Sequence, residues 1–407
     1  MGWDPVRLTV PRTSGRADGN LVLSGLTRLI ASGTAESRAE LVKRTGLARS
    51  TVNSHLEALL AAGVVVEKGA ISGGGRGRPA HRLGLAPRAG VVLAADVGAH
   101  STRLAVADLG QELLAERHVA LDLSVGPERS LDVLTEHLRS LVGGAGVATD
   151  QVKALVMGLP GPVDSRMGMP VRPPIMPGWD GFPVGDTMAD RFDCAASVDN
   201  DVNLMALGEA RALPADESPL LFLKVGTGIG GGIVSANGEL HRGSDGAAGD
   251  IGHIRVPGAD DVICQCGNVG CVEAVASAAA VLRGLRTESG GPGTTDDLAR
   301  LLRDGDPLAV RAIRAAAATI GEVVAMLVHF YNPKRIVLGG LITSVGDDLL
   351  AGIRSVVYRR ALPLATRNLS LANSALGRSA GVAGAVVAGI ENVLSPEGIR
   401  GLVREIP

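Results

Sequence analysis

The feature that most constrains the fold is a repeated pattern in which a short apolar run ends in a glycine-rich bend. It occurs in GVVLAADVG (90–98), KALVMGLPGPVD (153–164), SPLLFLKVGTGIGGG (218–232) and PKRIVLGGL (333–341). Helical stretches such as residues 309–333 lie between these runs. The alternation predicts an α/β fold. Backbone amides at such bends can approach an oxygen-rich ligand closely, so we expect a site for phosphates or sugars there.

The N-terminal part differs from this body in charge. Residues 1–86 contain twelve Lys and Arg against six Asp and Glu, a balance of +6, whereas the whole chain of 407 residues carries −2. The remaining residues therefore carry −8. A basic segment on an acidic body suggests contact with nucleic acid. We expect residues 1–19, rich in Gly, Pro and Arg, to be a disordered arm.

Residues 20–86 predict a winged helix-turn-helix. Apolar residues recur at helical spacing in NLVLSGLTRLIAS, ESRAELVKRTG and ARSTVNSHLEALLAAG. Ser37 and Glu40 predict the start of the second helix, and Gly46 its end. VVVEKGA and ISGGGRGRPAHRLGL predict two strands around a glycine-rich wing.

The third helix of such a domain enters the major groove, and wing arginines reach phosphates or the minor groove. A winged helix used for protein contacts alone is the alternative. The residues expected to contact DNA are Arg49, Ser50, Thr51, Asn53, Ser54, Arg76 and Arg78.

Three of the four cysteines lie in CQCGNVGCVE (264–273), and a histidine in GDIGHI (249–254) precedes them by eleven residues. Clustered thiols in a reducing compartment are more often metal ligands or catalytic groups than disulfides. The combination with an imidazole suggests a metal site. Cys194 has no such neighbour in the sequence, and we interpret it as a buried bystander.

From about Gly90 to its end the chain resembles the ROK family, which comprises repressors, uncharacterised reading frames and sugar kinases. The family's Cys-x-Cys-Gly-x-x-Gly-Cys-x-Glu stretch matches residues 264–273, and its preceding acidic motif ending in Gly-His matches GDIGH. The resemblance implies an actin-like, hexokinase-like ATPase fold with two lobes over residues 90–407 and a metal loop at 253–273. It implies one structural zinc ion, because four protein ligands close a tetrahedral site to water. These ligands would be His253, Cys264, Cys266 and Cys271.

The resemblance also implies a sugar site made of Asn200, Asp201, Asp250, His253 and Glu273. Asp201 lies in SVDNDVN and matches the aspartate that takes a proton from a sugar hydroxyl as the hydroxyl attacks ATP. Asn200 would hold another hydroxyl. The same stretch could cap the following helix, and both roles are compatible. Asp250 stands where the kinases usually have the longer Glu.

Two departures separate this chain from the kinases of the family. Their phosphate loop reads Asp-x-Gly-Gly-Thr-Lys/Asn, whereas DVGAHSTR keeps Asp96 and Gly98 but continues with Ala99, His100 and Ser101. A Cβ at position 99 restricts the backbone where it should approach a phosphate. Ile175 stands where the kinases have a sugar-binding Asn. The second glycine loop at 225–232 and LGG at 338–340 are intact. We expect no efficient phosphoryl transfer, so Asp201 would be a vestigial base.

The expected function is a DNA-binding transcriptional regulator, a repressor that answers to a sugar or sugar derivative. A homodimer or dimer of dimers would present two winged helices to a two-fold operator of double-stranded DNA, and sugar between the lobes would shift their spacing. One alternative is an active ATP-dependent sugar kinase with a DNA-binding head. Another is a regulator that senses a protein partner and no sugar. The absence of a membrane-length apolar run or a signal core predicts a cytoplasmic protein that avoids membranes.

Overall fold

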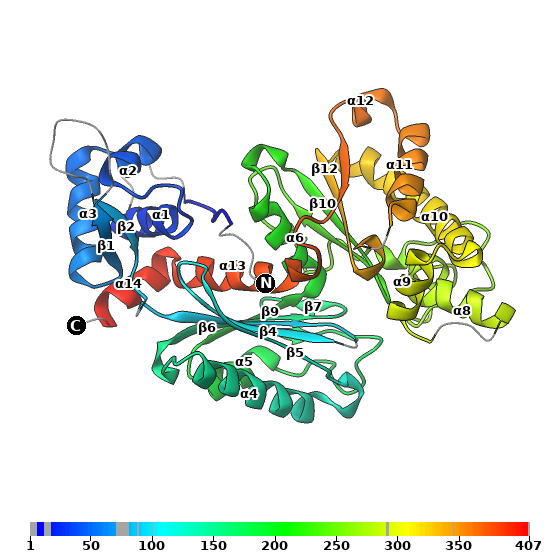
Figure 1. The fold of residues 1–407 in the computed structure, drawn as a ribbon, viewed down its shortest axis with the longest axis horizontal. Coiled ribbons are helices and arrows are strands. Elements are labelled where there is room, and N and C mark those ends of the chain that lie inside the picture. The colour runs from blue at the N-terminus through cyan, green and yellow to red at the C-terminus, as the bar shows by residue number, and fades with distance from the viewer. Residues whose placement is uncertain are drawn as a thin grey trace.

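The computed structural model describes residues 6–11, 18–70, 81–87, 89–99, 101–289, 293–344 and 346–405. They form a winged helix-turn-helix attached to an α/β body of two lobes (Figure 1). The predicted fold class is therefore confirmed. The winged helix lies at one end of the molecule, and the helices of the second lobe lie at the other.

The winged helix contains α1 (Gly19–Ala31), α2 (Arg38–Thr45) and α3 (Arg49–Ala61), followed by the antiparallel strands β1 (Val65–Ala70) and β2 (His81–Leu85). The Ser37 side chain accepts a hydrogen bond from the Glu40 amide, and Gly46 ends α2 in the left-handed conformation with φ of 68°, as predicted. Buried leucines from all three helices form its core: Leu26, Leu41, Leu56 and Leu59. Arg76 and Arg78 lie outside the described residues.

The first lobe is built on a five-stranded sheet with the strand order β5-β4-β3-β6-β9. Strands β3, β6 and β9 are parallel, and β4 and β5 are antiparallel to their neighbours. Helices α4 and α5 lie on one face, while α6 and α13 lie on the other (Figure 1). The elements are β3 (Val91–Val97), β4 (Thr102–Asp108), β5 (Leu113–Val119), α4 (Pro127–Gly144), β6 (Val152–Leu159), β7 (Val163–Asp164), β8 (Met169–Pro170), α5 (Val184–Phe192), β9 (Ala195–Asn200), α6 (Asp201–Ala212) and α13 (Ala380–Val393).

The second lobe has a four-stranded sheet with the order β11-β10-β12-β13, in which only the β10–β11 hairpin is antiparallel. Its elements are β10 (Leu220–Val225), β11 (Ile229–Val234), α7 (Val272–Ala276), α8 (Ala278–Ser289), α9 (Thr295–Arg303), α10 (Pro307–Tyr331), β12 (Arg335–Gly339), α11 (Asp348–Arg360), α12 (Pro363–Thr366) and β13 (Ser370–Asn373). Among the described helices, α10 has the length and composition of a membrane span. Its buried residues Ile313, Ile320 and Val324 belong to the core of this lobe, which is the pattern of an internal helix.

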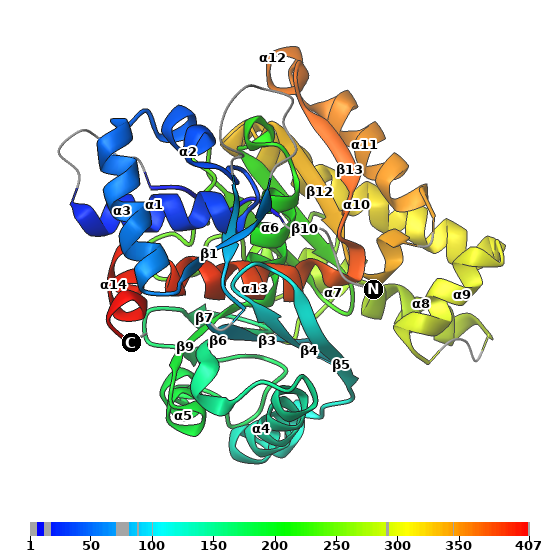
Figure 2. The same cartoon turned by 60° about the vertical axis from the view of Figure 1, so that its left-hand side comes forward.

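Helices α6 and α13 cross in direct backbone contact. A Cβ on Gly208 would collide with the Ala380 carbonyl, and one on Gly384 would collide with the Leu204 carbonyl. Only glycine fits at both points of this crossing. The two helix backbones therefore approach closely at these points, and Figure 2 shows α13 and α6 lying next to each other.

The winged helix and the first lobe share one hydrophobic core. Residues of α1 and α3 belong to the same buried cluster as Val92 of β3 and Ile390 of α13. The final helix, α14 (Pro396–Glu405), packs on α1 and contributes Ile399 and Leu402 to this cluster, although the sequence placed it with the body (Figure 2). The head is thus fixed to the first lobe by packing.

The expectation of a disordered arm over residues 1–19 is wrong for residues 6–11. Val6 and Leu8 are buried in the shared core. Val6 exchanges two backbone hydrogen bonds with the side chain of Gln111, at 2.9 and 2.8 Å. Residues 6–11 contain Val6, Leu8 and Val10, and the Gly, Pro and Arg content of residues 1–19 as a whole obscured this apolar pattern. We call residues 6–11 the N-terminal strap.

Candidate functional site: a cleft between the lobes and a DNA-facing helix

The exposed face of α3 is open to a ligand. Arg49, Ser50 and Ser54 are exposed, and no described hydrogen bond or ion pair engages their side chains. Thr51 and Asn53 are half-buried, and the Asn53 Oδ1 atom is enclosed without a hydrogen-bond partner. The predicted reading residues therefore share one end of α3, but Asn53 points partly into the domain.

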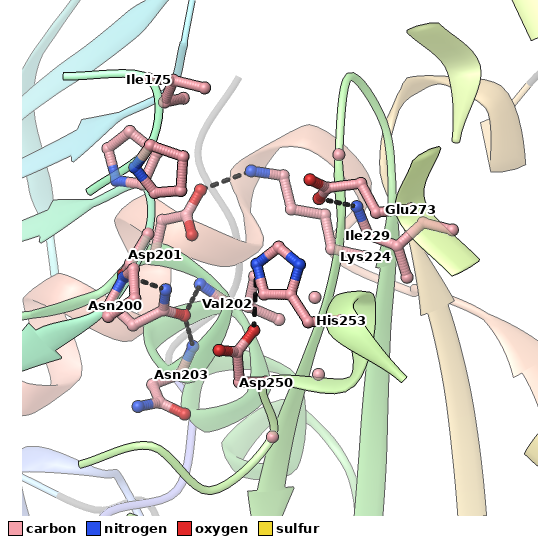
Figure 3. Close-up of a pocket in the computed structure, with 18 of the residues that line it drawn as sticks. Ile175, Asn200, Asp201, Val202, Asn203, Lys224, Ile229, Asp250, His253 and Glu273 are labelled. Atoms are coloured by element: carbon pink, nitrogen blue, oxygen red, sulfur yellow. Dashed lines mark hydrogen bonds and ion pairs between the residues drawn. The ribbon is translucent and has the colours of Figure 1, made fainter. Parts of the chain in front are cut away.

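A cavity of about 200 Å³ lies between the two lobes. It is lined by residues 160–162 after β6, by the start of α6, by the β10–β11 glycine loop, and by residues 246–253 (Figure 3). All five residues predicted for the sugar site line it: Asn200, Asp201, Asp250, His253 and Glu273. We refer to it as the first cavity.

Asn200 holds the start of α6. Its Oδ1 atom accepts hydrogen bonds from the Val202 and Asn203 amides at 2.9 and 3.3 Å, and its Nδ2 atom donates to the Gly161 carbonyl at 2.8 Å. The capping role anticipated for this stretch is therefore present. Asn200 still faces the first cavity, so it can serve a ligand as well.

A second polar group, Asp199, stabilises the start of α6. The buried Asp199 carboxylate accepts a hydrogen bond from the Asn203 Nδ2 atom at 2.9 Å and pairs with Arg242 at 2.7 Å. Arg242 belongs to the segment that connects β11 to Asp250. The pair therefore fixes this segment to the base of α6.

Asp201 is paired with Lys224 from β10, which sequence reasoning did not identify (Figure 3). Burial disfavours the charge of Lys224, but the pair with Asp201 and the nearby Asp96 and Glu273 outweigh it and raise the Lys224 pKa. Burial, with the neighbouring Asp201 charge, raises the Asp96 pKa to about 6. Asp201 thus shares its carboxylate with an ammonium partner at the edge of the cavity.

Glu273 stabilises the second glycine loop. Its Oε2 atom accepts a hydrogen bond from the Ile229 amide at 2.9 Å. On the opposite side of the cavity, the Asp250 Oδ1 atom lies 3.8 Å from the His253 Nε2 atom. Both pairs are visible in Figure 3. Asp250 therefore lies close to the imidazole of His253, one helical turn away, although its side chain is shorter than the Glu of the kinases.

The four predicted metal ligands meet in one place. The ligand atoms of His253, Cys264, Cys266 and Cys271 all lie within 4.8 Å of one another. Cys264 Sγ is 3.7 Å from His253 Nδ1, and Cys266 Sγ is 3.7 Å from Cys271 Sγ. Thiolates about 2.3 Å from a tetrahedral ion would be separated by about 3.8 Å, so the four residues fit a metal ion.

Cys194 stands apart from this cluster. It is half-buried against the core of the first lobe, and burial raises its thiol pKa to about 11. The thiol is therefore protonated at neutral pH and unreactive. This agrees with its interpretation as a bystander.

The first phosphate loop forms a tight turn. The Gly98 amide donates to the Ser101 carbonyl at 2.9 Å, and Ala99 lies between them at the border of the first cavity. Ala99 also lines an adjoining cavity of about 750 Å³, which we call the second cavity. His100 lies outside the described residues. Ile175 is 39% exposed and lines the first cavity, so an apolar side chain occupies this position of the wall.

Two lining residues were missed for different reasons. Asn203 is buried beside Asn200 and was present in the quoted SVDNDVN stretch, so the spacing could have revealed it. Lys224 lies in an apolar strand 23 residues from Asp201, and only the fold brings the two together.

Comparisons with known proteins agree with this geometry. The sequence profile of the ROK family matches residues 92–390. A xylose repressor from Caldicellulosiruptor bescii is 28% identical over 88% of this chain and 92% of its own length. A glucokinase from Halalkalibacterium halodurans is 29% identical over 71% of this chain and 92% of its own.

A solved structure shares the whole architecture. A ROK family transcriptional regulator, described as a homolog of the E. coli MLC protein, superimposes with a TM-score of 0.77. It is 25% identical and covers 95% of this chain and 99% of its own. The match includes the winged helix because it extends over nearly all of the described residues. By the profile match, and in agreement with the shared architecture, the chain belongs to the ROK family.

Proposed function

We propose that the chain is a cytoplasmic transcriptional repressor that binds operator DNA through α3 and the wing and releases it when a sugar enters the cleft. The observation that carries the proposal is the combination of two features. The polar side chains on the exposed face of α3 have no described partners, and the cleft contains the residues expected for a sugar site, where Lys224 pairs with Asp201. The xylose repressor and MLC-like relatives support the same assignment.

The cleft and the head are connected through α6. Its first residue, Asp201, lies in the first cavity, and Arg211 lies ten residues later, about 15 Å along the helix, near its other end. Arg211 is buried and pairs with Glu391 of α13 at 3.0 Å. Helix α13 starts beside Asp96 of the second cavity, because a Cβ on Gly381 would collide with the Asp96 carboxylate. Two helices, one from each cavity, therefore meet at the Arg211–Glu391 pair.

The N-terminal strap and the winged helix bind at the same point. The Thr9 amide donates to Glu391 at 2.7 Å, and its hydroxyl contacts Arg211. Arg28 of α1, itself buried, donates to the carbonyls of Thr9, Glu391 and Leu394. A small movement of α6 or α13 on sugar binding would therefore shift the position of α1. We name Thr9, Arg28, Arg211 and Glu391 the polar hub.

An active kinase is disfavoured by the first loop, where Ala99 adds a Cβ at the point at which the backbone would approach a phosphate. A coupled assay of sugar-dependent ATP consumption tests this point. We expect no turnover above background, and turnover at an ordinary enzymatic rate of about 1 s⁻¹ or more would restore the kinase.

We propose that the metal site holds one structural zinc ion. Three thiolates and an imidazole are preferred ligands of zinc, and four protein ligands exclude catalytic water. His253 would bind the metal through Nδ1 and present Nε2 to the first cavity, where Asp250 contacts it. Bound metal would supply no chemistry beyond holding His253 and Glu273 in place.

We propose that the regulator is a homodimer, because a two-fold operator requires two heads. A candidate contact face lies on α10, α11 and α12. Its large apolar side chains are exposed, with Phe330 at 91% and Leu364 at 74%. Apolar surface of this kind is typical of interfaces. The face consists of Met326, Phe330, Tyr358, Leu362 and Leu364.

The proposed function is tested by fluorescence anisotropy on DNA from upstream of the protein's own gene, at fixed salt. We expect tight binding that a sugar from a panel of hexoses, pentoses and amino sugars releases. Tight binding that no sugar weakens would favour control by a protein partner. Absence of binding to that DNA would contradict the repressor.

A further inference from the structure

We propose that Glu209 of α6 is a positioning residue that couples the second lobe to the winged helix. It ties the chain segment through which the second lobe joins α13 to the end of α6 that carries the polar hub. This inference rests on the proposed function and names the residue through which a movement of the second lobe would reach the hub.

The chain passes between the two lobes twice within the described residues. Residues 213–219 lead from α6 to β10, and residues 374–379 lead from β13 back to α13. A rotation of one lobe against the other must be absorbed by these two segments, because hinges are the few residues that join moving bodies. We call them the first and the second crossing.

The carboxylate of Glu209 holds the second crossing. Its Oε2 atom accepts hydrogen bonds from the Ser374 hydroxyl at 2.7 Å and from the Leu376 amide at 3.3 Å. Its Oε1 atom accepts from the Ala375 amide at 2.7 Å. The Ser374 hydroxyl in turn accepts from the Gly377 amide at 2.9 Å. Four consecutive residues of the crossing are thus arranged around one side chain of α6.

Glu209 also contacts the first crossing. Its backbone carbonyl accepts a hydrogen bond at 3.1 Å from the amide of Leu213, the residue with which this crossing begins. Helix α6 itself packs on α13 of the first lobe and on β10 and β11 of the second (Figure 1). Glu209 therefore lies where both crossings and both lobes meet.

The described partners of the Glu209 carboxylate are all neutral. The residue is 1% exposed, and its bonds come from one hydroxyl and two amides, with no described ion pair. A buried carboxylate without a cation adds little stability, since the loss of its hydration offsets the gain from its bonds. Its three donors do fix the geometry, because a displaced crossing would leave the buried charge unsatisfied. The carboxylate is therefore suited to hold one arrangement of the crossing.

The last turn of α6 connects this arrangement to the strap and the hub. Arg211 of the hub lies two residues after Glu209. Arg7 of the strap donates to the carbonyls of Ala210 and Leu213 at 2.8 Å each. The Arg7 amide also donates to the Arg211 carbonyl at 3.1 Å. The crossings and the strap thus hold the same helical turn, about 5 Å of the helix, so a shift at the crossing would move the strap and the hub with it.

Glu209→Gln tests the inference in the full chain. The amide keeps the size of the side chain but replaces one of its two acceptor oxygens with a donor, which would face a group that also donates. Fluorescence anisotropy would measure the affinity for DNA from upstream of the protein's own gene, without sugar and with saturating glucose, xylose or N-acetylglucosamine. The ratio of the two affinities is the release factor, and isothermal titration calorimetry would measure the affinity for each sugar.

We expect the release factor of Glu209→Gln to fall at least about fivefold, towards one, because the second lobe no longer moves α6. The affinity for the sugar and the affinity for DNA without sugar should each change by less than about threefold. A residue that only stabilised the fold would lower the melting temperature and leave the release factor unchanged.

Two further variants separate coupling from stability. Ser374→Ala removes one donor to the carboxylate and should lower the release factor by a smaller amount, so it decides the question if Glu209→Gln does not fold. Asp306→Ala is the matched control, because the Asp306 carboxylate accepts from the Leu308 and Ala309 amides at the start of α10, outside both crossings. It should melt at a lower temperature and keep the full release factor.

The outcomes separate the two proposals. If Glu209→Gln folds and keeps the full release factor, or if Ser374→Ala keeps it where Glu209→Gln does not fold, this inference is overturned and the sugar-responsive repressor stays intact. A fall of more than about threefold in the sugar affinity of Glu209→Gln also overturns it, because Glu209 would then belong to the sugar site. If no sugar releases DNA from the wild type, the proposed function itself is contradicted, and this inference with it.

Discussion

The exposed face of α3 and the cleft around Lys224 are both rich in polar side chains, but they differ in how far these side chains are already paired. Arg49, Ser50 and Ser54 have no described partner. Asp201 and Glu273, in contrast, each hold a specific bond. A face without internal bonds can bind DNA as it stands. A paired network must exchange bonds when a ligand enters, and this exchange can move the helices attached to it.

The polar hub lies between these two regions and belongs to neither. Its members come from the strap, α1, α6 and α13, and they are held by partly buried hydrogen bonds and an ion pair. Coupling between effector and DNA requires an element with two arrangements that both ligands favour differently. We propose that the α6–α13 pair is this element, because the close backbone contact at its glycine crossing would couple movement of one helix to the other.

The largest expected effect concerns the metal loop, which anchors the paired region. Cys266→Ala should lose zinc and the sugar response together, because His253 and Glu273 depend on the loop for their positions. Mass spectrometry of the intact protein and anisotropy measure the two properties. Cys194→Ala, which removes a thiol outside the cluster, should change neither. Full zinc retention by Cys266→Ala would refute the ligand set.

The next prediction separates DNA binding from the sugar response. Arg211→Gln should leave DNA binding close to normal but abolish release by sugar, a loss of about 1–3 kcal/mol of coupling. Breaking the buried pair with Glu391 should also cost about 3–5 kcal/mol of the free energy of unfolding.

Arg335→Gln is the control for the loss of stability that Arg211→Gln should cause. Arg335 pairs with Glu217 at 2.8 Å in the second lobe, away from the winged helix. The variant should lose stability but keep its sugar response. If Arg211→Gln responds to sugar as the wild type does, the hub does not carry the coupling.

Substitutions on the exposed face of α3 should have a smaller effect, which is confined to the discrimination between DNA sequences. Arg49→Ala should reduce discrimination between operator and scrambled DNA by about 1–3 kcal/mol, because a bidentate base contact is lost. Asn53→Ala should do less, since its Oδ1 atom is enclosed. Zinc content should not change in either. Footprints identical to the wild type in both variants would exclude this end of α3 as the reading surface.

The smallest expected effect is on stability and depends on pH. The pKa of Asp96 is raised to about 6, so the folded protein holds this proton more tightly than the unfolded chain. The resulting stabilisation is complete below about pH 4 and is lost as the pH rises through 6. Asp96→Asn should therefore gain roughly 1 kcal/mol at pH 7.5 and nothing at pH 4. Thermal melts at both pH values measure this, and equal gains would contradict the assignment.

Local patterns predicted much of the fold and site. The capping box at Ser37, the glycine end of α2 and the strand-to-glycine bends all depend on neighbours in the sequence, and the structure contains them. The four metal ligands could be predicted for the same reason, because three of them lie within eight residues of the sequence.

Interactions between distant segments could not be predicted. The Lys224–Asp201 pair joins a strand to a helix start, and nothing in the apolar run around Lys224 indicates a partner. The order of the strap depends on Gln111, 105 residues from Val6. The shared core of head and body depends on α14, which follows the family profile in the sequence but packs on α1.

The central claim is that the cleft and the DNA-facing helix are thermodynamically coupled, and linkage tests it most directly. Calorimetry would measure the affinity of the releasing sugar for the free protein and for the protein saturated with operator DNA. Because coupling is reciprocal, we expect DNA to weaken sugar binding by the same factor, about 5- to 150-fold, by which sugar weakens DNA binding. A sugar affinity that is identical with and without DNA would contradict the account.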